Sequence, residues 1–140
     1  CSSDLLFDFS LKLNLETQVR FRGRLENPQT LLQESDIFVL TSIYEGFGLV
    51  LLEAIQAKLP LVVTKNSATI EVLGKEYVGM STPRNPQEIA DKIVMFLDTS
   101  ARSIALHYLE SRLTNFDPYS MESQFEEIYR DVSSKYRSSS

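Results

Sequence analysis

Hydrophobic and polar positions along the chain form two kinds of segment. Apolar residues three or four positions apart, or good helix formers bounded by capping residues, predict helices. These helical segments are residues 4–15, 27–36, 48–58, 67–74, 85–99, 100–116 and 117–136. Short apolar runs rich in Val, Ile and Phe predict strands, most of them buried on both faces. These runs are residues 17–23, 36–42, 59–64 and 77–82.

The order of these segments predicts the architecture. Fully apolar strands that alternate with helices are typical of a parallel sheet covered on both sides. Right-handed crossovers then give an α/β fold, a Rossmann-like parallel sheet with helices on both faces. Sheets of this kind bind ligands at the carboxyl ends of their strands. The candidate chemistry should therefore lie in the loops that follow the strands.

Composition narrows the classes of function. The 140 residues suit one domain, and 43% hydrophobic and 24% charged residues are ordinary for a globular protein. A net charge of −5 disfavours nucleic acid as a partner. With one cysteine, Cys1, and one histidine, His107, a metal centre would need carboxylates alone. The tyrosines are interpreted as packing residues whose hydroxyls reach water.

One stretch carries the candidate chemistry: "SIYEGFGLVLLEAIQAKLP", residues 42–60. Glu45 follows a predicted strand, a Gly-Phe-Gly turn comes next, and Glu53 lies in the helix predicted to begin near Gly48. The first turn of a helix has N–H groups without internal partners, and its dipole attracts anions. Gly46 and Gly48 allow a tight turn and close approach of an anion to the backbone.

The two acids fit the two ends of one ligand. Glu53 lies where a carboxylate accepts hydrogen bonds from ribose hydroxyls in dinucleotide folds. Glu45 would face the group that the phosphate carries. The spacing therefore suits a diphosphate with a sugar on each side. The alternative stays open that Glu45 is a solvated loop residue and that Glu53 points to water.

Several segments together resemble one enzyme family. Four segments follow one another in the order found in the C-terminal lobe of retaining GT-B glycosyltransferases. They are "VRFRGRL" (residues 19–25), the long stretch of residues 31–64, "EVLG" (residues 71–74) and "NPQEIADKI" (residues 85–93). The chain is most similar to the group 1 type, family four, with a Glu-x7-Glu motif, here Glu45 to Glu53. The resemblance implies a domain of residues 1–118, incomplete on its N-terminal side, that binds a nucleotide sugar. It also implies that residues 119–140 form the C-terminal crossover helix and tail.

The resemblance also implies roles for individual residues. Glu45 would be the catalytic residue beside the donor sugar, and Glu53 would bind the ribose. The sugar and diphosphate would meet the backbone that follows the first acid, namely Gly46, Phe47, Gly48, Leu49 and Val50. Arg24 and Leu25 would border the base. Enzymes of this family transfer a sugar from a nucleoside diphosphate to an acceptor with retention and without an essential metal, so the resemblance implies no metal and no cofactor.

The chain also departs from the family pattern. The preceding Gly-rich strand, its Arg/Lys pair and the N-terminal acceptor lobe do not occur in these residues, so we expect a piece of a longer protein that is inactive alone. Its expected partners are a nucleoside-diphosphate sugar, the N-terminal lobe and a glycan or lipid-linked acceptor. Its expected location is the cytoplasm, with peripheral membrane contact through the other lobe left open.

A second departure keeps an alternative open. The Gly-Gly that often follows the third predicted strand is replaced by "KNSATIEVL", residues 65–73, in which Lys65 could add positive charge. The chain could therefore belong to a non-catalytic nucleotide-sugar-binding or regulatory module. A flavodoxin-like domain is disfavoured because neither its acid cluster nor flavin-contacting loops are found.

Overall fold

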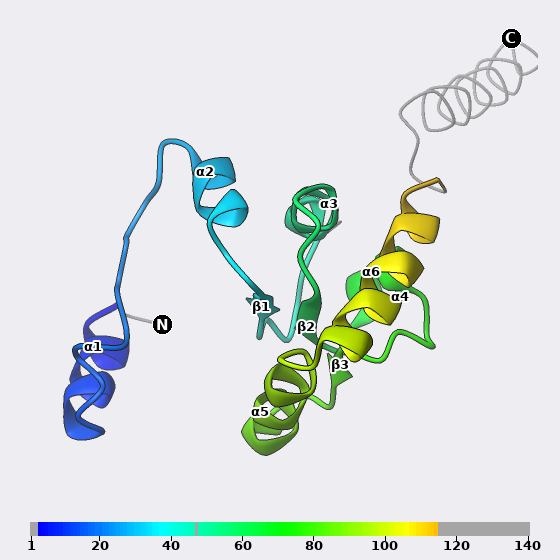
Figure 1. Cartoon of the computed structure of the whole chain (residues 1–140). Helices are drawn as coiled ribbons and strands as arrows, with labels where there is room; N and C mark the ends of the chain where they lie inside the picture. Colours follow the sequence, from blue (N-terminus) through cyan, green and yellow to red (C-terminus); the bar gives the residue numbers. More distant parts are fainter. Residues whose placement is uncertain (1–2, 47, 115–140) are drawn as a thin grey trace, which may run out of the picture.

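The computed structural model describes residues 3–46 and 48–114 (Figure 1). Its elements are α1 (Ser3–Lys12), α2 (Pro28–Gln33), β1 (Phe38–Leu40), α3 (Leu49–Gln56), β2 (Leu61–Thr64), α4 (Ser67–Leu73), β3 (Met80–Ser81), α5 (Pro86–Met95) and α6 (Thr99–Leu113). The predicted helix at 117–136, the end of the first predicted domain and all of the second, 119–140, lie outside the described residues.

The strands form one parallel sheet in the order β1-β2-β3. Phe38 lies opposite Leu61, and Val63 lies opposite Met80. All four residues of the central strand β2 are buried, because helices cover it on both sides. Figure 1 shows α3 and α4 on one side of the sheet and α5 on the other. The predicted α/β, Rossmann-like fold is confirmed.

Helices α3, α4 and α6 pack together beside the sheet. Leu51 of α3 and Leu109 of α6 are fully buried in this core. The carboxyl end of α4 is also fixed by polar contacts, since side chains of α6 donate hydrogen bonds to its last carbonyls. Tyr108 Oη donates to Leu73 O at 3.0 Å, and Arg112 Nη2 donates to Glu71 O at 2.9 Å. Helix α4 is therefore held by its neighbour as well as by apolar packing.

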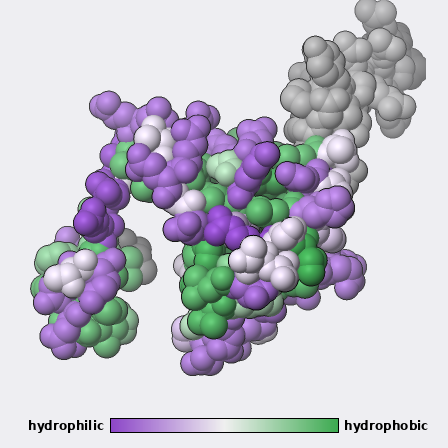
Figure 2. All heavy atoms as spheres, in the orientation of Figure 1, coloured by the Kyte–Doolittle hydropathy of each residue, from purple (hydrophilic) through white to green (hydrophobic). Residues whose placement is uncertain are grey.

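The N-terminal part differs from the prediction. Helix α1 forms as expected, but it lies apart from the sheet, and hydrophobic atoms show at its surface (Figures 1 and 2). The strand predicted at 17–23 is wrong. Its first residues form a turn, in which Val19 N donates to Leu15 O at 2.8 Å, and the remainder is irregular. A strand needs a neighbour to pair with, and β1 pairs only with β2 among the described residues.

Aromatic packing accounts for the place of this segment. The rings of Phe7 and Phe21 meet edge to face, with centroids 5.8 Å apart, so the irregular segment lies against α1. Within the described ranges 3–46 and 48–114, no helix has the length and apolar character needed to cross a membrane.

Candidate functional site

The loop between β1 and α3 carries the first predicted site residue. It runs from Thr41 to Gly48, and it lies at the carboxyl end of β1, as predicted. Glu45 is half-buried in this loop, and Gly46 is exposed. Phe47, predicted to contact the donor, lies outside the described residues. Parallel sheets place ligands at this end of the strands.

The start of α3 has the geometry of an open helix N-terminus. Gly48 is its N-cap, and it adopts a left-handed conformation with φ 74° and ψ 36°. The positive φ favours glycine at this position, and an added Cβ would also lie 3.1 Å from Leu51 Cδ1, a tight contact. In the described part of the chain, no side chain accepts a capping hydrogen bond at this helix. The N–H groups of Leu49 and Val50 therefore belong to a first turn without a side-chain acceptor, the kind of helix end that can bind an anion.

Gly46 meets a different requirement. It lacks a positive φ, and a Cβ added to it would meet no atom within 4 Å. The fold itself therefore does not need glycine at this position. Gly46 directly follows Glu45 in the chain, so a ligand that approached its backbone would also be near that acid.

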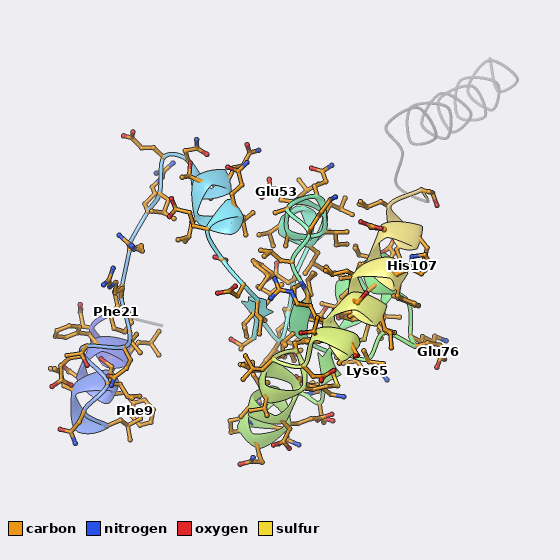
Figure 3. The ribbon with its side chains drawn as sticks, viewed as in Figure 1. Phe9, Phe21, Glu53, Lys65, Glu76 and His107 are labelled. Atoms are coloured by element: carbon orange, nitrogen blue, oxygen red, sulfur yellow. The ribbon has the colours of Figure 1, made fainter. Side chains whose placement is uncertain are left out.

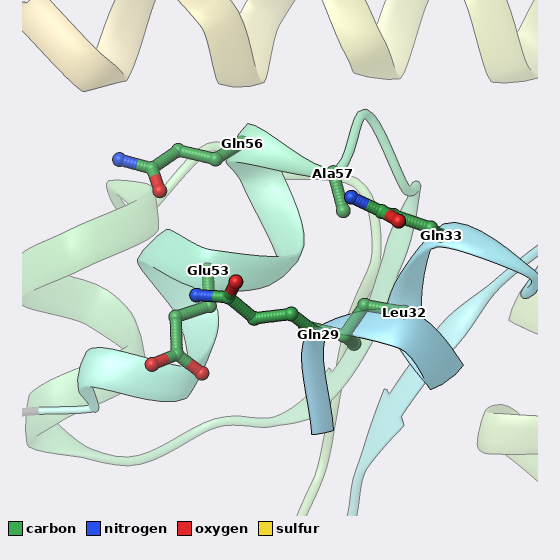
Figure 4. Close-up of a pocket in the computed structure, with 6 residues that line it drawn as sticks. All are labelled: Gln29, Leu32, Gln33, Glu53, Gln56 and Ala57. Atoms are coloured by element: carbon green, nitrogen blue, oxygen red, sulfur yellow. The ribbon is translucent and has the colours of Figure 1, made fainter. Parts of the chain in front are cut away.

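Glu53 lies on the side of α3 that faces α2 (Figures 3 and 4). It is half-buried, and it lines a pocket of about 160 Å³ between the two helices. The other lining residues are Gln29, Leu32, Gln33, Gln56 and Ala57. Figure 4 shows the carboxamide of Gln29 reaching from α2 towards the Glu53 carboxylate. Amide and carboxylate groups in one small pocket offer several donors and acceptors for hydroxyl groups.

The residues predicted to border the base do not lie in that pocket. Arg24 and Leu25 are exposed in the segment before α2. Leu25 lines a separate shallow hollow, whose other residues are Arg22, Asn27, Thr30, Leu31 and Glu34. The described structure therefore places Glu53 and Leu25 in two different hollows, each lined in part by α2.

The loop after β2 contains residues that the sequence did not single out for a role. Asn66 is the N-cap of α4: its Oδ1 accepts from Thr69 N, and its own N–H donates to Thr69 Oγ1, both at 2.9 Å. The Asn66 Nδ2 also donates to Ser42 O at 3.1 Å, in the loop after β1. The polar pair at positions 66 and 69 is a signal for this capping box. Nothing in the local sequence points to Ser42.

The loop after β2 also carries a cationic side chain. Lys65 is exposed beside this loop (Figure 3), and its backbone N–H donates to Ser81 O at 2.8 Å. In the described part of the chain, Lys65 forms no ion pair, and no cluster of His, Cys, Asp and Glu has the arrangement of a metal site. The candidate chemistry of this part thus consists of backbone amides, carboxylates and carboxamides.

Comparisons with known proteins give the family. The model of the family described as "Glycosyl transferases group 1" matches residues 2–109, which is most of the chain. A sucrose synthase from Melioribacter roseus is 32% identical over 104 residues, 69% of this chain and 13% of that protein. The N-acetyl-alpha-D-glucosaminyl L-malate synthase of Bacillus anthracis is 32% identical over 123 residues, 86% of this chain and 32% of that protein.

A solved structure agrees with these matches. S. aureus TarM, in a complex with Fondaparinux, alpha-GlcNAc-glycerol and UDP, superposes with a TM-score of 0.76 and 26% identity. The match covers 93% of this chain and 27% of TarM, so the chain spans about a third or less of these relatives. The family match and the shared fold lead to one conclusion: the chain belongs to the group 1 glycosyl transferases.

Proposed function

We propose that the complete protein is a retaining GT-B glycosyltransferase that transfers a hexose from a nucleoside-diphosphate sugar to a glycan or lipid-linked acceptor. In this proposal the 140 residues form its donor-binding lobe. Two kinds of finding support it. The chain belongs to a glycosyl transferase family, and its relatives bear the names of sugar-transferring synthases. The TarM structure, with the same fold, contains UDP.

The observation that carries the proposal is the open start of α3 between two acids. Gly48 leaves the first-turn amides uncapped at the carboxyl end of β1, with Glu45 before the turn and Glu53 after it. In the proposed complex these amides hold the diphosphate. Glu53 accepts from the ribose hydroxyls beside its pocket, and Glu45 lies at the donor sugar.

The remaining parts of the predicted donor site follow from this placement. Gly46, Phe47, Leu49 and Val50 provide backbone around the sugar and diphosphate. Arg24 and Leu25 are retained as the proposed border of the base, which requires their exposed segment to lie towards the ribose pocket when donor is bound. In the described structure, Leu25 and Glu53 line separate hollows, each beside α2.

The proposed chemistry depends on fixed dipoles. Amide groups that are already oriented stabilise the negative charge that develops on the departing diphosphate, without a metal ion. The acceptor would come from the N-terminal lobe, so catalysis would need both lobes and their closure, and the isolated chain would not transfer sugar. A cytoplasmic location, with membrane contact through the other lobe, stays a prediction.

Titration of the complete protein tests this proposal. UDP-glucose, UDP-N-acetylglucosamine and GDP-mannose are added separately, and binding is followed by calorimetry and donor hydrolysis by release of free sugar. The proposal expects one of these donors to bind and to be hydrolysed slowly without acceptor, with the released sugar first appearing in its original anomeric form. Absence of binding by all donors and by free UDP and GDP would contradict the assignment of a donor lobe.

One observation favours a second candidate function. The first turn of α4 is closed by the capping box of Asn66 and Thr69, at the loop where the resemblance implies a Gly-Gly beside the donor. Fewer free amides would then face the sugar, as expected of a nucleotide-binding module without transfer activity. The same titration separates the two candidates: binding without hydrolysis or transfer to any acceptor favours the module.

A further inference from the structure

We propose that Asn66 is a positioning residue, which fixes the loop carrying Glu45 to the end of the central strand. The inference rests on the proposed function, because it concerns the placement of a donor-binding loop. Its starting point is one contact: Asn66 Nδ2 donates to Ser42 O at 3.1 Å. Ser42 lies between the end of β1 and Glu45, and Asn66 lies between β2 and α4. The contact therefore joins the loops that follow two adjacent parallel strands.

The Asn66 side chain is held in one orientation. Its Oδ1 accepts from Thr69 N at 2.9 Å, which leaves the Nδ2 group as the donor towards Ser42. Thr69 is fully buried. Its hydroxyl accepts a hydrogen bond from Asn66 N and donates one to Thr64 O at 3.1 Å. The amide that reaches Ser42 is thus fixed by a buried neighbour, and little side-chain entropy remains to be lost when it forms this bond.

The backbone around Asn66 is fixed as well. Lys65 N donates to Ser81 O at 2.8 Å, so the pairing of β2 with β3 continues one residue past the end of β2. The other end of α4 is fixed by Arg112 and Tyr108 of α6. Asn66 therefore projects from a rigid part of the domain.

The loop on the other side of the contact has few attachments of its own. Tyr44 is 91% exposed and Ile43 is 37% exposed, and Gly46 meets open space. Residues 43–46 form no hydrogen bond with another residue in the ranges 3–46 and 48–114. The Asn66 contact at Ser42 is thus the polar attachment nearest to Glu45 on the β1 side. Displacement of a substrate-facing group by about 1 Å can cost roughly 100-fold in rate, which is why such an attachment matters.

Asn66→Asp separates the two roles of this residue. Aspartate is as good a helix cap as asparagine, so α4 is retained. The aspartate carboxylate, however, cannot donate a hydrogen bond to Ser42 O, and it repels that carbonyl. In the complete protein we expect only the small fall in melting temperature that goes with the loss of one hydrogen bond. Because the loop loses its attachment, chymotrypsin should cleave after the exposed Tyr44 at least about 10-fold faster than in the wild type. We also expect about 10- to 100-fold lower kcat for hydrolysis of the donor that the wild type accepts, with KM changed less than about threefold.

Two further variants serve as controls. Thr69→Val removes the hydroxyl that accepts from Asn66 N but keeps the Thr69 N–H that holds Asn66 Oδ1. It should lower the melting temperature and speed cleavage after Tyr44 less than Asn66→Asp does. Glu71→Ala, at an exposed position of α4, should leave cleavage and kcat as in the wild type. Asn66→Ser, which caps α4 with a shorter side chain, replaces Asn66→Asp if the latter does not fold, and the same loss of kcat and faster cleavage are expected.

The outcomes distinguish this inference from the proposed function. Wild-type rates of cleavage after Tyr44 in Asn66→Asp would overturn the attachment, and faster cleavage with unchanged kcat would overturn its role in positioning. If the wild type neither binds UDP or GDP nor hydrolyses any donor, the proposed function fails and the positioning role fails with it. The cleavage measurement then still decides whether Asn66 holds the loop.

Discussion

The hydroxyl of Tyr77 makes both backbone hydrogen bonds to one residue of the central strand: it accepts from Leu61 N and donates to Leu61 O, each at 2.9 Å. Strand β3 begins only at Met80, so a side chain takes the place of a neighbouring strand at this level of the sheet. Burial raises the pKa of the Tyr77 hydroxyl far above its ordinary value, and the hydrogen bond with Leu61 opposes this only in part. The expectation that this hydroxyl reaches water is wrong.

The first prediction concerns this contact. Tyr77→Phe leaves the N–H and carbonyl of Leu61 buried without these partners, and each unsatisfied group costs free energy. We expect the free energy of unfolding to fall by about 2 kcal/mol. Urea denaturation measures it, with Tyr44→Phe at an exposed position as the control. A loss for Tyr77→Phe no larger than for the control would contradict the structural role.

The second prediction compares two glycines in one loop. Gly48→Ala forces a side chain into a left-handed conformation and against Leu51, so it should destabilise the domain by about 1–2 kcal/mol. Gly46→Ala meets open space and should change stability by less than about 0.5 kcal/mol. If the donor occupies that space, Gly46→Ala weakens nucleotide-sugar binding while the fold remains. Equal stability losses in the two variants would contradict the loop geometry.

The third prediction tests the pocket between α2 and α3. Glu53→Ala should weaken binding of nucleoside diphosphates to the complete protein by roughly 10-fold or more, because two ribose hydroxyls lose a charged acceptor. Alanine suits a helix, so the melting temperature should change little. Calorimetry with UDP and GDP measures the affinity, and Glu110→Ala, on the exposed side of α6, is the matched control. Unchanged affinity in Glu53→Ala would argue against the ribose role.

The fourth prediction tests the acid before the glycine turn. Glu45→Gln keeps the size of the side chain and removes its charge, so it should reduce donor turnover more than it reduces affinity for the nucleoside diphosphate. We expect a loss of about 100-fold in kcat and less than about threefold in affinity for UDP or GDP. Steady-state kinetics and calorimetry separate the two quantities. Equal losses in both would contradict a place beside the sugar.

The fifth prediction concerns acid stability at the start of α5. Thr82 N donates to the Glu88 carboxylate at 2.7 Å, and this hydrogen bond, with smaller help from Lys92, lowers the pKa of Glu88. The stabilisation is therefore complete above the ordinary pKa of 4.5 and is lost as the pH falls through the lowered value. The difference in urea midpoint between wild type and Glu88→Gln should be constant above about pH 5 and should shrink as the pH falls below the ordinary pKa and through the lowered one. A difference independent of pH would contradict this.

The sequence predicted β1 and β2 because the runs at residues 36–42 and 59–64 are apolar on both faces and are bounded by turn residues. It predicted the place of Glu45 for the same reason: the position of a residue after a strand determines the edge at which it lies. The strand at 17–23 failed because alternation of Val, Arg and Phe indicates only a segment able to pair, and a strand also needs a neighbour.

The contact between Asn66 and Ser42 was beyond prediction for a similar reason. The two residues are 24 positions apart, and they meet only because β1 and β2 pair in a particular register. The capping of α4 is local, since Asn66 and Thr69 are three positions apart, the spacing of a capping box. The direction in which the Asn66 Nδ2 group points, by contrast, depends on the tertiary structure. The pocket beside Glu53 likewise depends on the packing of α2 against α3, which no periodicity specifies.

The exposed apolar face of α1 affects how these 140 residues behave when they are prepared alone. The solvent-exposed fractions are 65% for Leu5, 59% for Phe9 and 51% for Leu6. Contiguous exposed apolar side chains of this kind promote self-association as the protein concentration rises. A version that starts at Asn27 keeps the sheet and all helices from α2 onward, and dynamic light scattering should find it dispersed at concentrations where the longer chain forms clusters.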